Sequence, residues 1–197
     1  VEDIDLSLED FVQKVNSDLV GKLVNIASRT AGFISKKFDG RLSSELANPD
    51  LVEAIQAKGP DIREAFENRE FSKATREIMA LADDVNAWIA EVAPWQLAKN
   101  EATLPDVQPI CTTAINAFRL LVLYLKPVMP MLSDKVQTFL QVDRLDYESL
   151  NHTLLDHQIE AFTPLITRIE MKDVEAMIQP EVTEIKDTTQ TSTPSGI

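Results

Sequence analysis

Apolar residues recur at intervals of three and four over most of this chain, the spacing that places them on one face of an α-helix. The first stripe consists of Phe11, Val12, Val15, Leu19, Leu23, Ile26, Ala27, Ile34 and Phe38. Ser7 precedes it as a helix cap, and Asp39-Gly40 follows it, where glycine tolerates a left-handed turn. The pattern predicts one helix of about 30 residues, which is well above the usual globular length, so it should span the domain.

Proline, glycine and capping residues divide the rest of the chain into further helices. The predicted segments are a helix from Asn48-Pro49 that is interrupted at Gly59-Pro60 and runs to Phe66, a helix from Phe71 to Pro94, a loop over 100–109, a helix from Ile110 to Pro127, a short helix from Ser133 to Leu140, irregular chain over 143–162 and a last helix over 164–178. No strand-like alternation is sustained. The sequence therefore predicts an all-α fold, a helical bundle of four to five main helices.

Composition supports one globular domain. The chain has 197 residues, of which 44% are apolar, and five glycines, so a helical fold with a real core is expected. Cys111 is the single cysteine, which excludes an internal disulfide and suits a reducing, cytoplasmic location. We find no apolar run near the ~20 residues of a membrane span and no signal peptide. The chain begins at Val1 rather than methionine, which suggests a fragment or a processed product.

The charges of the chain give two opposite indications about nucleic-acid binding. The net charge of −13 argues against nucleic-acid binding, for which a basic surface is expected. The segment from Lys14 to Arg41, however, carries six basic residues and only two acidic ones. A basic stretch inside an acidic chain leaves room for a local nucleic-acid site.

Two short segments carry the chemistry that such a site needs. Asn25 and Arg29 are four residues apart in the first predicted helix, so they project from the same face. In Ala93-Pro94-Trp95 the tryptophan directly follows a helix-breaking proline, so its ring should lie at a helix end. An amide, a guanidinium and an indole are groups that read and stack unpaired bases. If the two segments meet in space, they form a base-reading site.

The same segments resemble a known family. Leu23–Phe33 looks like the first helix of the anticodon-binding domain of bacterial methionyl-tRNA synthetase. The resemblance continues through Arg76–Ala82 with Ala93-Pro94-Trp95, through the Leu-x-Pro-x-x-Pro turn in Leu123–Pro130, and through Ile166–Lys172. These motifs, in this order, cover roughly residues 1–178. They imply a helical bundle of the class I synthetase anticodon-binding type.

The resemblance also implies roles for individual residues. Trp95 falls on the tryptophan that stacks on an anticodon base, and Asn25, Arg29 and Pro94 fall on positions that contact bases of the methionine anticodon. Asn86, in the helix that precedes Trp95, is a further candidate for approaching the anticodon loop. The implied partner is a tRNA with the methionine anticodon.

Departures from the family pattern limit what this chain can do. Some relatives carry an aspartate five residues before the tryptophan, where this chain has Ala90, so a carboxylate contact there is absent or replaced. The two ATP-site signatures, a His-x-Gly-His stretch and a Lys-Met-Ser-Lys-Ser loop, are missing. His152 and His157 are five residues apart and do not suggest a metal site. We therefore expect no catalytic, metal or cofactor residues here, and a fragment of a methionine–tRNA ligase that is inactive alone. ATP and methionine, with zinc as an open alternative, would belong to the catalytic part.

The predicted organisation has three parts. An anticodon-binding bundle covers 1–163, a C-terminal helix over 164–178 packs toward the catalytic domain of the same enzyme, and the polar stretch 179–197 is disordered. Two alternatives stay open. The chain could be the equivalent bundle of another class I synthetase, or a helical module that binds protein, which the acidic composition favours.

Overall fold

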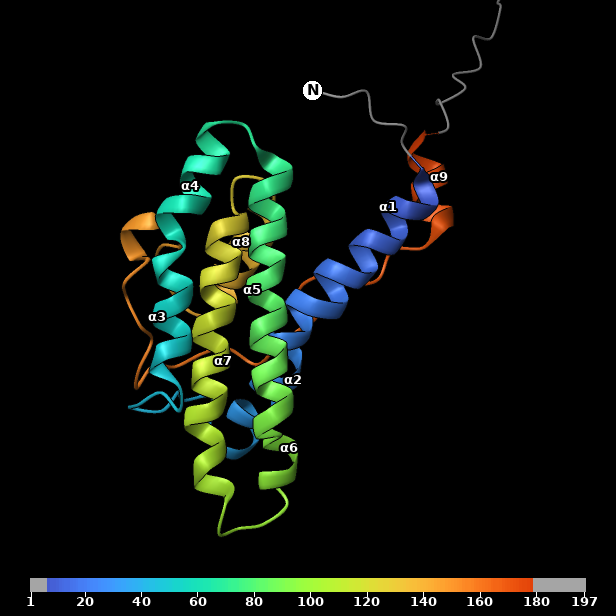
Figure 1. Ribbon diagram of the computed structural model, residues 1–197. Helices are drawn as coiled ribbons and strands as arrows, with labels where there is room; N and C mark the ends of the chain where they lie inside the picture. Colours follow the sequence, from blue (N-terminus) through green and yellow to red (C-terminus); the bar gives the residue numbers. More distant parts are fainter. Residues whose placement is uncertain (1–6, 179–197) are drawn as a thin grey trace, which may run out of the picture.

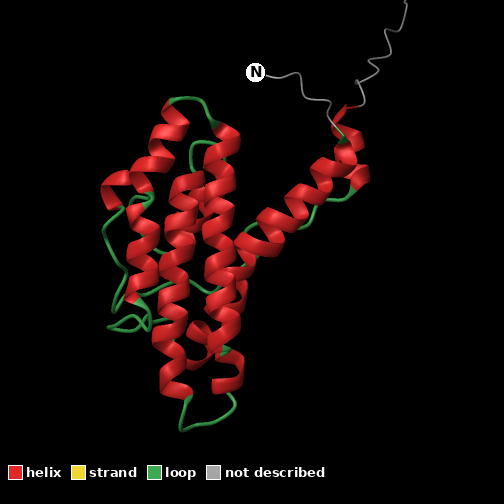
Figure 2. Ribbon diagram, in the orientation of Figure 1, coloured by secondary structure: helices red, strands yellow, loops and turns green. Residues whose placement is uncertain are grey.

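The computed structural model describes residues 7–178, and every secondary-structure element named in that range is helical (Figure 1). In chain order the elements are α1 (Leu8–Lys14), the π-helix η1 (Val15–Val24), α2 (Asn25–Lys37), α3 (Pro49–Ala57), α4 (Gly59–Glu67), α5 (Phe71–Val92), α6 (Pro94–Leu97), α7 (Leu104–Leu125), α8 (Pro130–Phe139), the 3-10 helix η2 (Tyr147–Ser149) and α9 (Met171–Ile178). Figure 2 shows these helices joined by loops. The all-α bundle predicted from the sequence is confirmed.

The first predicted helix is continuous in extent but changes its geometry. Ser7 caps α1, because its hydroxyl oxygen accepts a hydrogen bond from the Asp10 backbone N–H at 3.2 Å. The chain then runs as a π-helix through η1 before α2 resumes ordinary α-helical pairing. In Figure 1, the helical segment labelled α1 extends away from the bundle, and α9 lies beside it. This extension is called the arm. Asn16 fastens the returning chain to this arm through two hydrogen bonds of 2.9 Å with the backbone of Ile169.

Three helix boundaries differ from the predicted ones. Helix α7 begins at Leu104 rather than Ile110, α8 begins at Pro130, and α9 begins only at Met171. Proline is tolerated in the first turn of a helix because the N–H it lacks would have no partner there. Pro105 and Pro130 occupy that position, so prolines that suggested a loop or a helix end mark helix starts instead. The tail predicted to be disordered lies outside the described residues.

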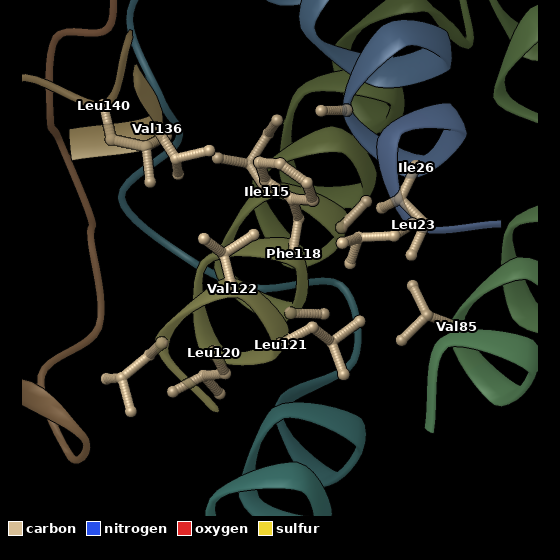
Figure 3. Packing of buried hydrophobic residues seen from close by; sticks show 14 of the residues in the cluster. Leu23, Ile26, Val85, Ile115, Phe118, Leu120, Leu121, Val122, Val136 and Leu140 are labelled. Carbon is tan, nitrogen blue, oxygen red and sulfur yellow. The ribbon is translucent and has the colours of Figure 1, made fainter. Parts of the chain in front are cut away.

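Helix α7 is the centre of the bundle. It contacts α2, α3, α4, α5, α6 and α8, and every residue from Ile110 to Leu125 is buried. Within residues 7–178 it is the one helix long and apolar enough, by composition, to cross a membrane, but 89% of its most apolar window is buried inside the protein. Figure 3 shows Phe118 among the buried side chains, with Leu23 and Ile26 beside Val85 of α5. Helix α7 is therefore the core helix of this bundle.

Two polar residues in the middle of α7 fasten the irregular chain that follows α8. Asn116 exchanges hydrogen bonds with the backbone of Leu154, accepting at 2.7 Å and donating at 3.0 Å. Arg119 donates to the carbonyl of Ser149 at 3.0 Å, and also to those of Leu150 and His152. Burial lowers the pKa of Arg119 to about 10, so it is still a cation at neutral pH. These bonds hold a segment that has little regular structure of its own.

Candidate nucleic-acid interface

The candidate site is built around the break between α5 and α6. Ala93 ends α5 in a left-handed conformation with φ of 45°, and Pro94 is the first residue of α6. The fixed φ and missing N–H of proline suit that first position. Pro94 is buried, and Trp95 next to it is half-buried and packs against the hydrophobic core. The ring therefore lies at a helix end, as the sequence predicts.

Arg29 reaches this ring from a different helix. Its guanidinium carbon lies over the Trp95 ring, 4.3 Å from the ring centroid. This is a cation–π contact, in which the positive charge is attracted by the electron-rich face of the indole. The structure thus brings together two predicted site residues that are far apart in the sequence. One face of the indole carries the guanidinium in this arrangement.

Asn25 is placed on the same helix as Arg29. It is the first residue of α2, lies one turn before Arg29 and is half-buried. Its backbone carbonyl accepts a hydrogen bond from the Ser28 hydroxyl at 3.1 Å. Asn25 and Arg29 therefore share a helix face, and Arg29 links that face to Trp95.

Asn86 lies in a different environment from the other candidates. Its amide nitrogen donates to the carbonyl of Lys22 at 3.1 Å and to that of Ala82 at 2.8 Å. Its amide oxygen is buried and has no hydrogen-bond partner among the described residues. Both amide donors are used inside the protein. The sequence carries no signal of this, because the main partner is a backbone carbonyl of another helix.

Some of the basic residues between Lys14 and Arg41 form ion pairs and others do not. Lys14 pairs with Asp18 at 2.9 Å, Lys22 with Asp83 at 2.9 Å, and Arg41 with Asp156 at 3.5 Å. The other three cations of the segment form no ion pair within residues 7–178, and all of them belong to α2. They are Arg29, Lys36 and Lys37. Positive charge without a carboxylate neighbour is thus concentrated on the helix that carries the candidate site.

Position 90 carries no charge, and the carboxylate that comes nearest before the tryptophan in the sequence is Glu91, which is exposed on α5. Ala90 is exposed on α5, so the position where some relatives carry an aspartate offers only a methyl group. Lys99, just after α6, is exposed and bonds the Gln96 side chain at 2.8 Å. In the part of the chain that the structure describes, no three His, Cys, Asp or Glu side chains are grouped as metal ligands. The arrangement offers stacking and hydrogen bonding rather than acid–base or metal chemistry.

Comparison with known proteins identifies the type of bundle. The chain is similar to the free-state structure of methionyl-tRNA synthetase from Mycobacterium tuberculosis, with a TM-score of 0.76 and 24% identity over 84% of this chain and 35% of that one. Two structures of the same enzyme with methionyl-adenylate give TM-scores of 0.72 and 0.74 at 24% identity, over 81% of this chain and 33% of theirs. The fold is thus that of a helical bundle found in an aminoacyl-tRNA synthetase. This chain spans about a third of the length of those proteins.

The family itself is shown by a sequence model. The model of the anticodon binding domain of methionyl tRNA ligase matches residues 41–176, and the chain belongs to this family. The family assignment decides against the equivalent bundle of another class I synthetase. The matched residues include Asn86, Pro94 and Trp95, whereas Asn25 and Arg29 precede them. The link between the two parts of the site is the contact of Arg29 with Trp95.

Proposed function

We propose that this chain recognises the anticodon of methionine tRNA through the surface around Trp95. The observation that supports this most directly is the cation–π contact of 4.3 Å between Arg29 and Trp95, in a member of an anticodon-binding family. A half-buried indole is held by the core on one side and is still reachable from solvent. Such a ring is a platform for an unstacked base.

Stacking on the indole would contribute part of the affinity at this surface. A base on an aromatic side chain contributes roughly 1–3 kcal/mol. Because Arg29 lies over one face of the indole, a base either replaces the guanidinium there or extends the stack from the guanidinium plane. In both arrangements the donors of Arg29 lie near a base edge, and Asn25 one turn away can add a hydrogen bond. Lys36 and Lys37, both exposed, can meet the phosphate backbone.

We expect this surface to act as part of a longer enzyme that also has a catalytic domain. Recognition of the anticodon would orient the tRNA for ATP-dependent aminoacylation by a catalytic domain, where ATP and methionine bind. The arm would carry the contact with that domain, because α9 buries Val174 while Met177 is 85% exposed. The expected location of such an enzyme is the cytoplasm, in keeping with the buried, unpaired thiol of Cys111.

Binding of a small RNA tests this function directly. The probe is a stem-loop with the methionine anticodon, and its control is the same stem-loop with the three anticodon bases in reversed order. Fluorescence anisotropy at one fixed salt concentration should give at least about tenfold tighter binding of the methionine stem-loop, a difference of ~1.4 kcal/mol. Equal affinities would contradict anticodon recognition, and no binding of either would contradict RNA binding.

A further inference from the structure

The junction between η1 and α2 leaves a backbone group that needs a partner. A π-helix pairs each carbonyl with the N–H five residues on, whereas an α-helix pairs it with the N–H four residues on. Where the first pattern changes to the second, the donors run one short and one carbonyl is left over. The change takes place between Val24 and Asn25, so the leftover carbonyl belongs to the last turn of η1. An unpaired carbonyl inside a bundle is unfavourable.

Asn86 brings a hydrogen-bond donor to this last turn of η1 from a neighbouring helix. Its amide nitrogen lies 3.1 Å from the carbonyl oxygen of Lys22, which belongs to that last turn. The second hydrogen of the same nitrogen bonds the Ala82 carbonyl at 2.8 Å, within α5 itself. With two carbonyls as neighbours, the amide must present its nitrogen to them, and the buried oxygen is left without a partner. The side chain is thus oriented for its donor role.

The location of this bond connects it with the candidate site. Lys22 lies three residues before Asn25 and less than two full turns before Arg29. If the donor from Asn86 is lost, the junction can move along the chain, and each residue that changes from π-helical to α-helical geometry adds a rotation to the helix face that follows it. Such a rotation at the start of α2 would carry Asn25 away from its present direction relative to Trp95.

We infer that Asn86 is a positioning residue of the anticodon site: its amide holds the π-to-α junction and thereby fixes the helix face that presents Asn25 and Arg29. The part of this inference that concerns the anticodon site rests on the proposed function, whereas the first test, which measures the junction itself, does not. Asn86 then acts through Lys22 and needs no contact with RNA. This role differs from the approach to the anticodon loop that the sequence suggested for Asn86.

The first experiment needs no RNA. Asn86→Leu keeps the approximate size of the side chain and removes the donor. Asp83→Asn is the matched control, because it breaks the ion pair with Lys22 between the same two helices and leaves the junction carbonyl bonded. Hydrogen exchange followed by NMR should show at least tenfold faster exchange at residues 25–29 in Asn86→Leu and little change in Asp83→Asn. Unchanged exchange in Asn86→Leu would overturn the inference.

The second experiment measures the affinity ratio for the methionine and reversed stem-loops. Asn86→Leu should lower this ratio at least fivefold. Val52→Ala, a core variant on α3, controls for general loss of stability and should keep the ratio. An equal loss in both variants, or none in Asn86→Leu, would overturn the positioning role. If the unaltered protein binds neither RNA, the proposed function fails while hydrogen exchange still decides the junction. Should Asn86→Leu not fold, Asn86→Asp removes the donor at constant size and is measured in the same two ways.

Discussion

Arg29 and Trp95, which come from two separate helices, form a cation–π contact with 4.3 Å between guanidinium carbon and ring centroid. Each residue alone has an ordinary explanation, as a surface cation or as an aromatic cap on a bundle end. Together they place a positive charge against an aromatic face, and the helix of Arg29 carries further exposed lysines, Lys36 and Lys37. Planar cations and aromatic faces are what single-stranded RNA bases stack on.

Removing the indole should weaken RNA binding without unfolding the protein. Trp95→Ala is expected to lower the affinity for the methionine stem-loop at least about tenfold, because base–aromatic stacking contributes roughly 1–3 kcal/mol. Circular dichroism should show unchanged helix content. Trp88→Phe is the control, since Trp88 packs against the core in the C-terminal part of α5. Unchanged affinity of Trp95→Ala would remove this residue from the site.

Arg29 should determine specificity more than overall affinity. In Arg29→Ala, the preference for the methionine stem-loop over the reversed one should fall by about 1–3 kcal/mol, the range for a bidentate base contact. Lys73→Ala, in the first turn of α5 and so at the opposite end of that helix from Trp95, should leave both affinities unchanged. Equal weakening of both stem-loops by Arg29→Ala would instead identify a phosphate contact.

The sequence predicts the helices of this fold better than their ends. The helix that starts at Phe71 is confirmed to Val92, because its apolar stripe and the following proline agree. The start of α7 was placed six residues too late, since Pro105 and Pro109 suggested a loop. Helix α7 accommodates Pro109 because the carbonyl left without a donor belongs to Pro105, which is exposed to water. Hydrophobic periodicity also contains no signal for the π-helical segment of the first helix, since the stripe continues through it.

Loss of the buried Arg119 should destabilise the protein. Arg119→Met keeps an unbranched apolar stem and leaves the carbonyls of Ser149, Leu150 and His152 without their donor. We expect the free energy of unfolding to fall by about 2–4 kcal/mol, because Arg119 is buried and hydrogen bonds from a charged donor contribute more than those between neutral groups. Urea denaturation measures this change.

Arg144→Met provides the comparison within the same part of the chain. Arg144 is exposed and pairs with Asp146 and Glu148 on the surface. Exposed ion pairs contribute up to about 1 kcal/mol, so this variant should remain close to the unaltered protein. Similar losses in the two arginine variants would contradict the bonding role of Arg119.

The buried thiol should make stability depend on alkaline pH. Burial raises the pKa of Cys111 from 9.0 to about 12. A group with a raised pKa in the folded state contributes stability that is complete below pH 9.0 and is lost as the pH rises toward 12. Urea unfolding over this range should therefore show a shallower fall for Cys111→Ala than for the unaltered protein, with a difference of up to about 1.4 kcal/mol per pH unit. Identical slopes would contradict burial of the thiol.

The candidate site was foreseen in its residue types but not in its contacts. The spacing of Asn25 and Arg29 and the proline before Trp95 follow from local rules. The pairing of Arg29 with Trp95 depends on how α2 and α6 pack against α7, which no local pattern encodes. The bonds of Asn86 and Arg119 were missed for a related reason: both residues donate to backbone carbonyls, and any residue can provide a carbonyl. The functional roles of Asn25, Arg29, Pro94 and Trp95 remain predictions.

Helix α7 touches six other helices, and every residue from Ile110 to Leu125 is buried. Solvent can reach its backbone amides only after the surrounding helices have separated from it. Deuterium uptake in α7 should therefore follow global unfolding, while the arm takes up deuterium much sooner through local opening. The same molecule would combine a core helix that opens rarely with an arm that opens often. This contrast would let the arm adjust its angle while the end of the bundle around Trp95 keeps its shape.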